Sequence, residues 1–184
     1  NQLLSTGKEN GKFVATLRKG SQEPALEKGH DKTLIVFSSE LDRAIASLVI
    51  ATGAASMGRK VTMFFTFWGL NVLRKPEKVA VQKQGLERAF GWMMPRGSKK
   101  LGLSKMNMLG IGPKLIRKVM SQKNVDSLEA LLGQAKLMGV RLVACQMSMD
   151  VMGIKPEELI DGVEIGGVAT YLAAAETSDT NLFI

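Results

Sequence analysis

The fold is decided by the stretch Thr33-Leu-Ile-Val-Phe37 and the two segments that follow it, residues 40–57 and Lys60-Val-Thr-Met-Phe-Phe-Thr-Phe67. The first run is continuously apolar, as in a strand that is covered on both faces of a sheet. Residues 40–57 have the spacing of a helix, and Gly58 supplies its stop. The third segment is a second apolar strand. This order of strand, helix and strand predicts a parallel sheet with a right-handed crossover.

The same alternation continues toward the carboxyl end of the chain. Residues 126–138 predict a helix capped by Asp126, and it leads into the apolar run Arg141-Leu-Val-Ala-Cys145. The remaining segments predict a short helix at 155–161, a brief strand or turn at 162–166, a helix at 167–176 and a strand at 180–184. We therefore expect an α/β domain over residues 32–184, with an open, mostly parallel sheet and helices on both faces.

The first 18 residues have a different pattern. Asn10-Gly11 lies between two runs of strand-forming residues, and this dipeptide is the strongest local signal for a β-hairpin. Residues 19–31 are polar and contain Gly and Pro, so we expect a linker there. Because the chain starts within a strand and without an initiator Met, we expect a fragment of a longer polypeptide.

Residues 74–124 form a long insert that is basic and rich in Met and Gly. A connection of this length in a compact domain is typical of a lid or a binding element. Eight Lys and Arg residues and no Asp or Glu lie between Arg96 and Lys123, which equals the formal net charge of +8 for the whole chain. Such a segment attracts an acidic partner, although a solvated basic face fits the same composition. The candidate docking residues are Lys99, Lys100, Arg117 and Lys118.

Cys145 is the one cysteine of the chain, and it ends a predicted strand, where open α/β sheets place reactive groups. A lone thiol forms no internal disulfide, and a Cys/His zinc site is excluded because His30 is the one histidine. The thiol is therefore either a buried structural residue or a nucleophile. The polar segment after Cys145 must turn, and a helix that starts there would favour a thiolate.

Several side chains are candidates for supporting the sulfur of Cys145. Hydroxyl and N–H groups at the ends of neighbouring strands would stabilise an anion, and Met side chains would limit access of water. The candidate supporting residues are Ser38, Ser39, Gln146, Met147 and Ser148. The expected apolar wall consists of Met147, Met149 and Met152.

Missing motifs exclude several classes of enzyme. The turn after the first strand, Phe37-Ser-Ser-Glu-Leu-Asp42, lacks the glycine pattern of a Rossmann dinucleotide site. Gly110-Ile-Gly-Pro-Lys114 has the wrong spacing for a phosphate loop. A Ser/His/Asp triad cannot be assembled, because the single histidine lies in the predicted linker. No apolar run has the length needed to cross a bilayer, and the unpaired cysteine favours a reducing cytoplasm.

Four segments together resemble the DsrE/DsrF family. They are the strand at 33–37, Trp68-Gly-Leu-Asn71, Ala144-Cys-Gln-Met-Ser-Met-Asp-Val-Met-Gly153 and Asp179-Thr-Asn-Leu-Phe-Ile184. The resemblance covers residues 32–184 and points to the larger branch of the family, often fused to rhodanese and TusA-like domains or to pyridine-nucleotide disulfide reductases. It implies an intracellular sulfur carrier or sulfurtransferase that holds sulfane sulfur as a persulfide on Cys145. No metal or organic cofactor is required.

The same resemblance implies the partners and the assembly of the protein. Rhodanese-like, TusA-like or disulfide-reductase domains would donate or accept the sulfur, and the chain would form a homo-oligomer. The hairpin at 1–18 resembles the closing strands of a TusA-like domain. That family's Cys-Pro motif is absent from the hairpin, which implies a remnant that does not carry sulfur itself.

Two alternatives to a sulfur carrier rest on the insert. A peripheral membrane or scaffold protein would use its basic and apolar residues. A nucleic-acid-binding module fits less well, because residues 96–123 contain no Phe, Tyr or Trp for base stacking. The Met side chains of the insert are also hard to bury within one small domain, which favours a homo-oligomer independently of the family resemblance.

Overall fold

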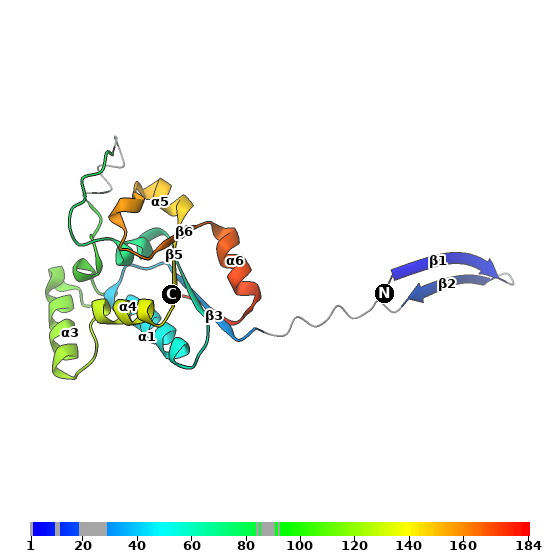
Figure 1. Cartoon of the computed structure of the whole chain (residues 1–184), viewed down its shortest axis with the longest axis horizontal. Helices are drawn as coiled ribbons and strands as arrows, with labels where there is room; N and C mark the ends of the chain where they lie inside the picture. The colour runs from blue at the N-terminus through cyan, green and yellow to red at the C-terminus, as the bar shows by residue number, and fades with distance from the viewer. Residues whose placement is uncertain (1, 10–11, 19–28, 84, 86–90, 92) are drawn as a thin grey trace.

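The computed structural model describes residues 2–9, 12–18, 29–83, 85, 91 and 93–184. Its main domain is built on a five-stranded sheet in the order β6-β5-β4-β3-β7 (Figure 1). All neighbouring strands of this sheet are parallel, so the predicted open α/β sheet is confirmed. The strands are Asp31–Val36 (β3), Val61–Phe65 (β4), Arg141–Cys145 (β5), Glu164–Gly166 (β6) and Ser178–Phe183 (β7).

Helices lie on both sides of the sheet, as the sequence predicts (Figure 1). Helices α1 and α4 pack against each other on one face, and α6 covers the other face. None of the helices in the described ranges has both the length and the apolar character that a membrane span requires. The α-helices are Leu41–Ser56 (α1), Ile111–Gln122 (α3), Leu128–Leu137 (α4), Gln146–Met152 (α5) and Val168–Glu176 (α6).

The alternation of strand side chains divides the apolar residues between two layers. Met63 and Leu142 are at most 1% exposed and join α1 and α4 in the main core. Phe64 points to the opposite face, where it forms a smaller cluster with Cys145 against Tyr171 of α6. The candidate thiol therefore lies on the α6 side of the sheet.

Short 3-10 turns complete the connections between these elements. The predicted helical turn after β4 is present, whereas the helix predicted at 155–161 is a single 3-10 turn over Pro156–Glu158. The cap of α4 differs from the prediction, because the hydroxyl of Ser127 accepts the N–H of Ala130 (3.2 Å) and not Asp126. The turns are Phe67–Leu73 (η1), Ser98–Lys100 (η2), Met108–Gly110 (η3) and Pro156–Glu158 (η4).

The insert at 74–124 is attached to the domain at several described points. Leu101 is 1% exposed in the main core, and the next residue, Gly102, accepts the N–H of Leu41 at the start of α1 (2.7 Å). The N–H of Ser104 donates to the carboxylate of Asp42 in α1 (3.0 Å). These contacts hold the segment that leads into α3.

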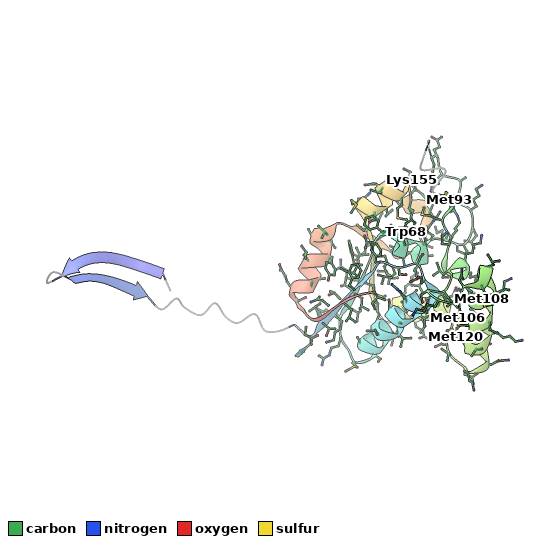
Figure 2. The ribbon with its side chains drawn as sticks, turned by 180° about the vertical axis from the view of Figure 1, so that it is seen from behind. Trp68, Met93, Met106, Met108, Met120 and Lys155 are labelled. Atoms are coloured by element: carbon green, nitrogen blue, oxygen red, sulfur yellow. The ribbon has the colours of Figure 1, made fainter. Side chains whose placement is uncertain are left out.

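Helix α3 is the amphipathic helix that the sequence predicts around residues 114–120. Figure 2 shows Met106, Met108 and Met120 at this helix. Met106 and Met108 are 76% and 63% exposed, whereas Met120 is half-buried. Part of the Met-rich insert is therefore exposed to solvent and does not belong to the hydrophobic core.

A separate two-stranded antiparallel hairpin precedes the domain. Its strands are Gln2–Glu9 (β1) and Lys12–Arg18 (β2), with Glu9 opposite Lys12. The predicted Asn-Gly turn and residues 19–28 of the predicted linker lie outside the described residues. Strand β3 begins at Asp31, one residue before the predicted start of the domain.

Candidate thiol site

Cys145 lies at the edge of the sheet where the carboxyl ends of the parallel strands meet. It is the last residue of β5 and also the N-cap residue of α5. Strand β4 runs beside β5, and Thr66 directly follows its last residue, Phe65. Parallel neighbours end at the same edge of a sheet, which is where open α/β proteins bind their ligands.

Three residues place hydrogen-bond donors around the sulfur of Cys145. Ser148 contributes its hydroxyl and its backbone N–H, Thr66 contributes its hydroxyl, and Met147 contributes its backbone N–H. The two hydroxyls also bond to each other, with Thr66 Oγ1 2.8 Å from Ser148 Oγ, so one of them donates to the other and the second keeps its proton for the sulfur. Donors arranged in this way favour the thiolate over the neutral thiol.

The pKa of Cys145 reflects a competition between burial and these hydrogen bonds. Only 4% of the residue is exposed, and burial by itself raises the pKa of the thiol. The hydrogen bonds from Ser148, Thr66 and Met147 act in the opposite direction, and the net effect lowers the pKa below the ordinary value of a cysteine. The protein therefore provides a dry site whose donors suit an anionic sulfur.

The structure brings two of the predicted supporting residues to the sulfur. Ser148 is fully buried beside it, and Met147 acts through its backbone. The side chain of Gln146 is exposed and donates to Asp150 (2.9 Å) instead. Gln146 is next to Cys145 in the sequence, but none of the described hydrogen bonds joins its side chain to the sulfur.

The expected methionine wall is wrong. Met147 is 54% exposed, whereas Met149 and Met152 are buried in the main core. The apolar surroundings of the thiol are supplied instead by Phe64 and Tyr171, whose ring centroids lie 5.6 Å apart. Phe64 lies in β4 and Tyr171 in α6, so both are far from Cys145 in the sequence, and a search among its sequence neighbours could not find them.

Ser38 and Ser39 follow β3, and β4 lies between β3 and β5. The strand that ends next to Cys145 is therefore β4, and the residue that follows β4 is Thr66. Ser38 and Ser39 follow a strand that is one position farther away in the sheet. The Ser38 hydroxyl donates to the carboxylate of Glu40 (2.8 Å). Thr66 is the supporting residue that the sequence reasoning missed, although a hydroxyl directly after a buried strand was the available signal.

The four candidate docking residues have different environments. Lys99 and Lys100 in η2 and Lys118 in α3 are exposed. Arg117 is half-buried, donates to the Ser98 carbonyl (2.7 Å) and lies 3.5 Å from the carboxylate of Glu129. The three lysines are thus available to a partner, while the guanidinium of Arg117 is engaged within the chain.

The chain is similar to several known proteins. The chain is 51% identical to the uncharacterized protein YrkE of Bacillus subtilis over 152 residues, which are 83% of this chain and 95% of that protein. It is 35% identical to the sulfur carrier protein DsrE2 of Allochromatium vinosum over 155 residues, which are 82% and 96% of the two chains. The crystal structure of the ychN protein from E. coli matches with a TM-score of 0.49 and 15% identity, over 84% of this chain and 99% of that one.

A family model matches most of the described domain. The model is that of the DsrE/DsrF/DrsH-like family, and the match runs over residues 29–183. This range includes the whole sheet and the Cys145 site and excludes the hairpin. The protein therefore belongs to the DsrE/DsrF/DrsH-like family, as the resemblance of its sequence motifs implies.

Proposed function

We propose that the protein is a sulfur carrier that accepts sulfane sulfur on Cys145 and passes it to a second thiol. The observation that carries this proposal is a buried sulfur at the N-cap position of α5, beside the paired hydroxyls of Ser148 and Thr66, in surroundings that lower the pKa of the thiol. A structural thiol needs no such surroundings. The relative named as the sulfur carrier protein DsrE2 supports the same role.

The transfer is a thiol exchange whose atoms and electrons balance without an added oxidant or reductant. The Cys145 thiolate attacks the outer sulfur of a donor persulfide. A new sulfur–sulfur bond forms to Cys145 while the donor's sulfur–sulfur bond breaks, and the donor leaves as a thiolate that takes up the proton that Cys145 released when it ionised. Release repeats the exchange with an acceptor thiolate as the attacking group. The donors around Cys145 stabilise its anionic form before loading and after release.

Burial limits the kind of donor that can reach this sulfur. Because Cys145 is 4% exposed, the outer sulfur must arrive on a narrow group such as a persulfide or a polysulfide. We propose that a protein donor docks first through Lys99, Lys100 and Lys118, whose charges would steer an acidic surface toward the domain. Such a carrier requires a reducing compartment, and we propose the cytoplasm.

A transfer assay tests the proposal. The protein is loaded with polysulfide, freed of excess reagent and mixed with a TusA-like acceptor that contains one reactive cysteine. We expect the acceptor to gain sulfur and Cys145 to return to the thiol. The Cys145→Ser variant, treated identically, controls for residual polysulfide. Sulfur that stays on the loaded protein with every acceptor offered would contradict a carrier role.

A contact with an anionic membrane surface is a second candidate function, because α3 presents an apolar ridge to solvent. Ile111, Leu115 and Val119 occur every four residues and are 62%, 60% and 40% exposed. Lys114 and Lys118 lie beside this ridge on the helix and are exposed. A helix with an apolar face flanked by basic residues is typical of an interfacial helix on anionic lipid.

Vesicle cosedimentation distinguishes the occupants of this ridge. We expect binding to vesicles that contain phosphatidylserine, weaker binding to neutral vesicles, and loss of binding for Leu115→Glu. Ala130→Glu, an exposed position on α4, is the matched control. If light scattering shows an oligomer that Leu115→Glu dissociates while no vesicle binds, the ridge is the contact between copies of the chain that the sequence predicts.

A further inference from the structure

The buried carboxylate of Glu158, the last residue of η4, forms ion pairs with three cationic side chains. Glu158 is fully buried, and one of its oxygens lies 3.0 Å from Arg74 Nη2 and 3.1 Å from Arg96 Nη1. Its other oxygen lies 2.5 Å from Lys83 Nζ. The exposed fractions of these side chains are 0% for Arg74, 9% for Lys83 and 15% for Arg96. This cationic cluster is formed by residues far apart in the sequence.

The charges of the cationic cluster do not balance. Three cations share one carboxylate, and the other acceptor that the described contacts supply is the neutral Asn71 amide oxygen, 3.2 Å from Arg74 Nη1. A buried charge without a counter-charge costs several kcal/mol. Among the described residues, two positive charges therefore lack a counter-charge. Burial lowers the pKa of Arg74.

The cluster also keeps unused hydrogen-bond donors. Arg74 Nε, Lys83 Nζ and Arg96 Nη1 are buried and make no hydrogen bond of acceptable geometry within the described part of the chain, although the last two lie within ion-pair distance of Glu158. Buried donors are nearly always satisfied in native proteins. An acceptor group that brings negative charge would satisfy both the donors and the charge.

A cavity gives such a group a place beside the cluster. Lys83 and Arg96 line a pocket of about 1200 Å³, and Lys78 and Lys100 at the same pocket are exposed and add positive charge. The remaining wall includes apolar side chains, among them Val79, Met93 and Met94. Figure 2 labels Met93 near the end of the domain that also carries Lys155. Among the described residues that line this pocket, none is Asp or Glu.

We propose that this pocket binds a small oxyanion of charge −2, of the sulfate or phosphate class, held by Lys83 and Arg96. A dianion matches the excess of two positive charges, and its several oxygens match the unused donors. A small ligand fits better than a macromolecular surface, because the two side chains that would hold it are at least 85% buried. The site is distinct from Cys145 and does not depend on sulfur transfer.

Calorimetric titration of the full chain with sulfate and with phosphate, in buffer free of other divalent anions, tests the site. We expect saturable binding of one anion per chain, weakened at least about tenfold by Lys83→Met or Arg96→Met, because a charged hydrogen bond contributes about 1.5–3 kcal/mol. Lys60→Met, at an exposed lysine outside the pocket, should bind normally. Tighter binding of sulfate than of phosphate would assign the pocket to sulfur oxyanions, and the reverse order would assign it to phosphate groups.

Two outcomes would overturn the proposal. One is the absence of saturable binding of either anion to the wild-type protein, and the other is binding that neither Lys83→Met nor Arg96→Met weakens. If Arg96→Met unfolds, Lys83→Met alone decides, because it leaves the pair of Arg74 and Glu158 intact. Repeating the titration with Cys145→Ser shows that the anion does not act through the thiol, so this result is independent of the sulfur-carrier function.

Discussion

Replacement of Ser148 by alanine tests whether hydrogen bonds activate the thiol. Ser148→Ala removes the hydroxyl that donates to the Cys145 sulfur but keeps the backbone N–H of residue 148. It also leaves Thr66 without the hydroxyl that now lies 2.8 Å from its own. Fewer hydrogen bonds then offset the effect of burial, which raises the pKa of the thiol. The pKa of Cys145 should rise.

The size of the kinetic effect follows from the free energy of the lost bond. A hydrogen bond to a charged group contributes about 1.5–3 kcal/mol, so the thiolate population below the pKa should fall roughly 10- to 100-fold. A thiolate of higher pKa is intrinsically more nucleophilic, with a Brønsted coefficient of about 0.4–0.5, which recovers close to half of the loss on a logarithmic scale. The observed rate constant for alkylation should therefore fall roughly three- to tenfold.

The assay is the pH dependence of iodoacetamide alkylation of Cys145, followed by mass spectrometry. The midpoint of the profile should move to higher pH in Ser148→Ala, and the rate at the lowest pH should show the full decrease. Ser38→Ala is the matched control, since that hydroxyl bonds to Glu40. Identical profiles for the wild type and Ser148→Ala, with equal urea midpoints, would refute the assignment of Ser148 to the thiol.

Three further outcomes are expected. Glu158→Gln should lower the free energy of unfolding by about 3–5 kcal/mol, because it leaves buried cations unpaired; an equilibrium urea curve unchanged from that of the wild type would contradict this. The pKa of Glu158 is lowered, against the opposing effect of burial, by the nearby Lys83 ammonium, the backbone N–H of Lys155 and the Arg74 guanidinium. The contribution of Glu158 to stability should therefore be complete above the pKa of an unfolded glutamate, about 4.3, and should disappear as the pH falls through the lowered value. A bulky aromatic disulfide should react with native Cys145 at least about tenfold more slowly than with the urea-unfolded chain, and equal rates would show that the thiol is open to solvent. Reversal of Lys99, Lys100 and Lys118 to Glu should slow sulfur transfer from an acidic protein donor at low salt and leave polysulfide loading unchanged; Lys60→Glu is the control, and equal slowing of both routes would locate the effect in the thiol site.

The sheet and the position of the thiol were predictable because they depend on local patterns. The apolar runs at 33–37 and 60–67 with a helix between them specify a parallel pair, and Cys145 ends a third run of the same kind. Ser148 was predictable for a related reason, since it lies in the turn that must follow this strand.

The supporting role of Thr66 and the buried ion pairs of Glu158 could not be predicted, because they depend on the order of the strands and on contacts between residues far apart in the sequence. Ser38, Ser39 and Thr66 are all hydroxyl residues after strands, and only the position of β4 between β3 and β5 distinguishes them. The pair of Arg74 and Glu158 joins residues 84 positions apart. From the local sequence, Arg74 and Glu158 would both be expected to lie on the surface, because the hydrophobic periodicity around them does not indicate that they are buried.

Intact-mass spectrometry of sulfur loading decides whether Cys145 carries sulfur. The protein is incubated with polysulfide or with a persulfidated rhodanese beside a known thiol carrier, and the Cys145→Ser variant is treated in parallel. We expect the wild type to gain the mass of one or more sulfur atoms, a reductant to remove them, and the variant to gain none. An unchanged wild-type mass under conditions that load the known carrier, or an equal gain in Cys145→Ser, would exclude Cys145 as the sulfur-carrying residue.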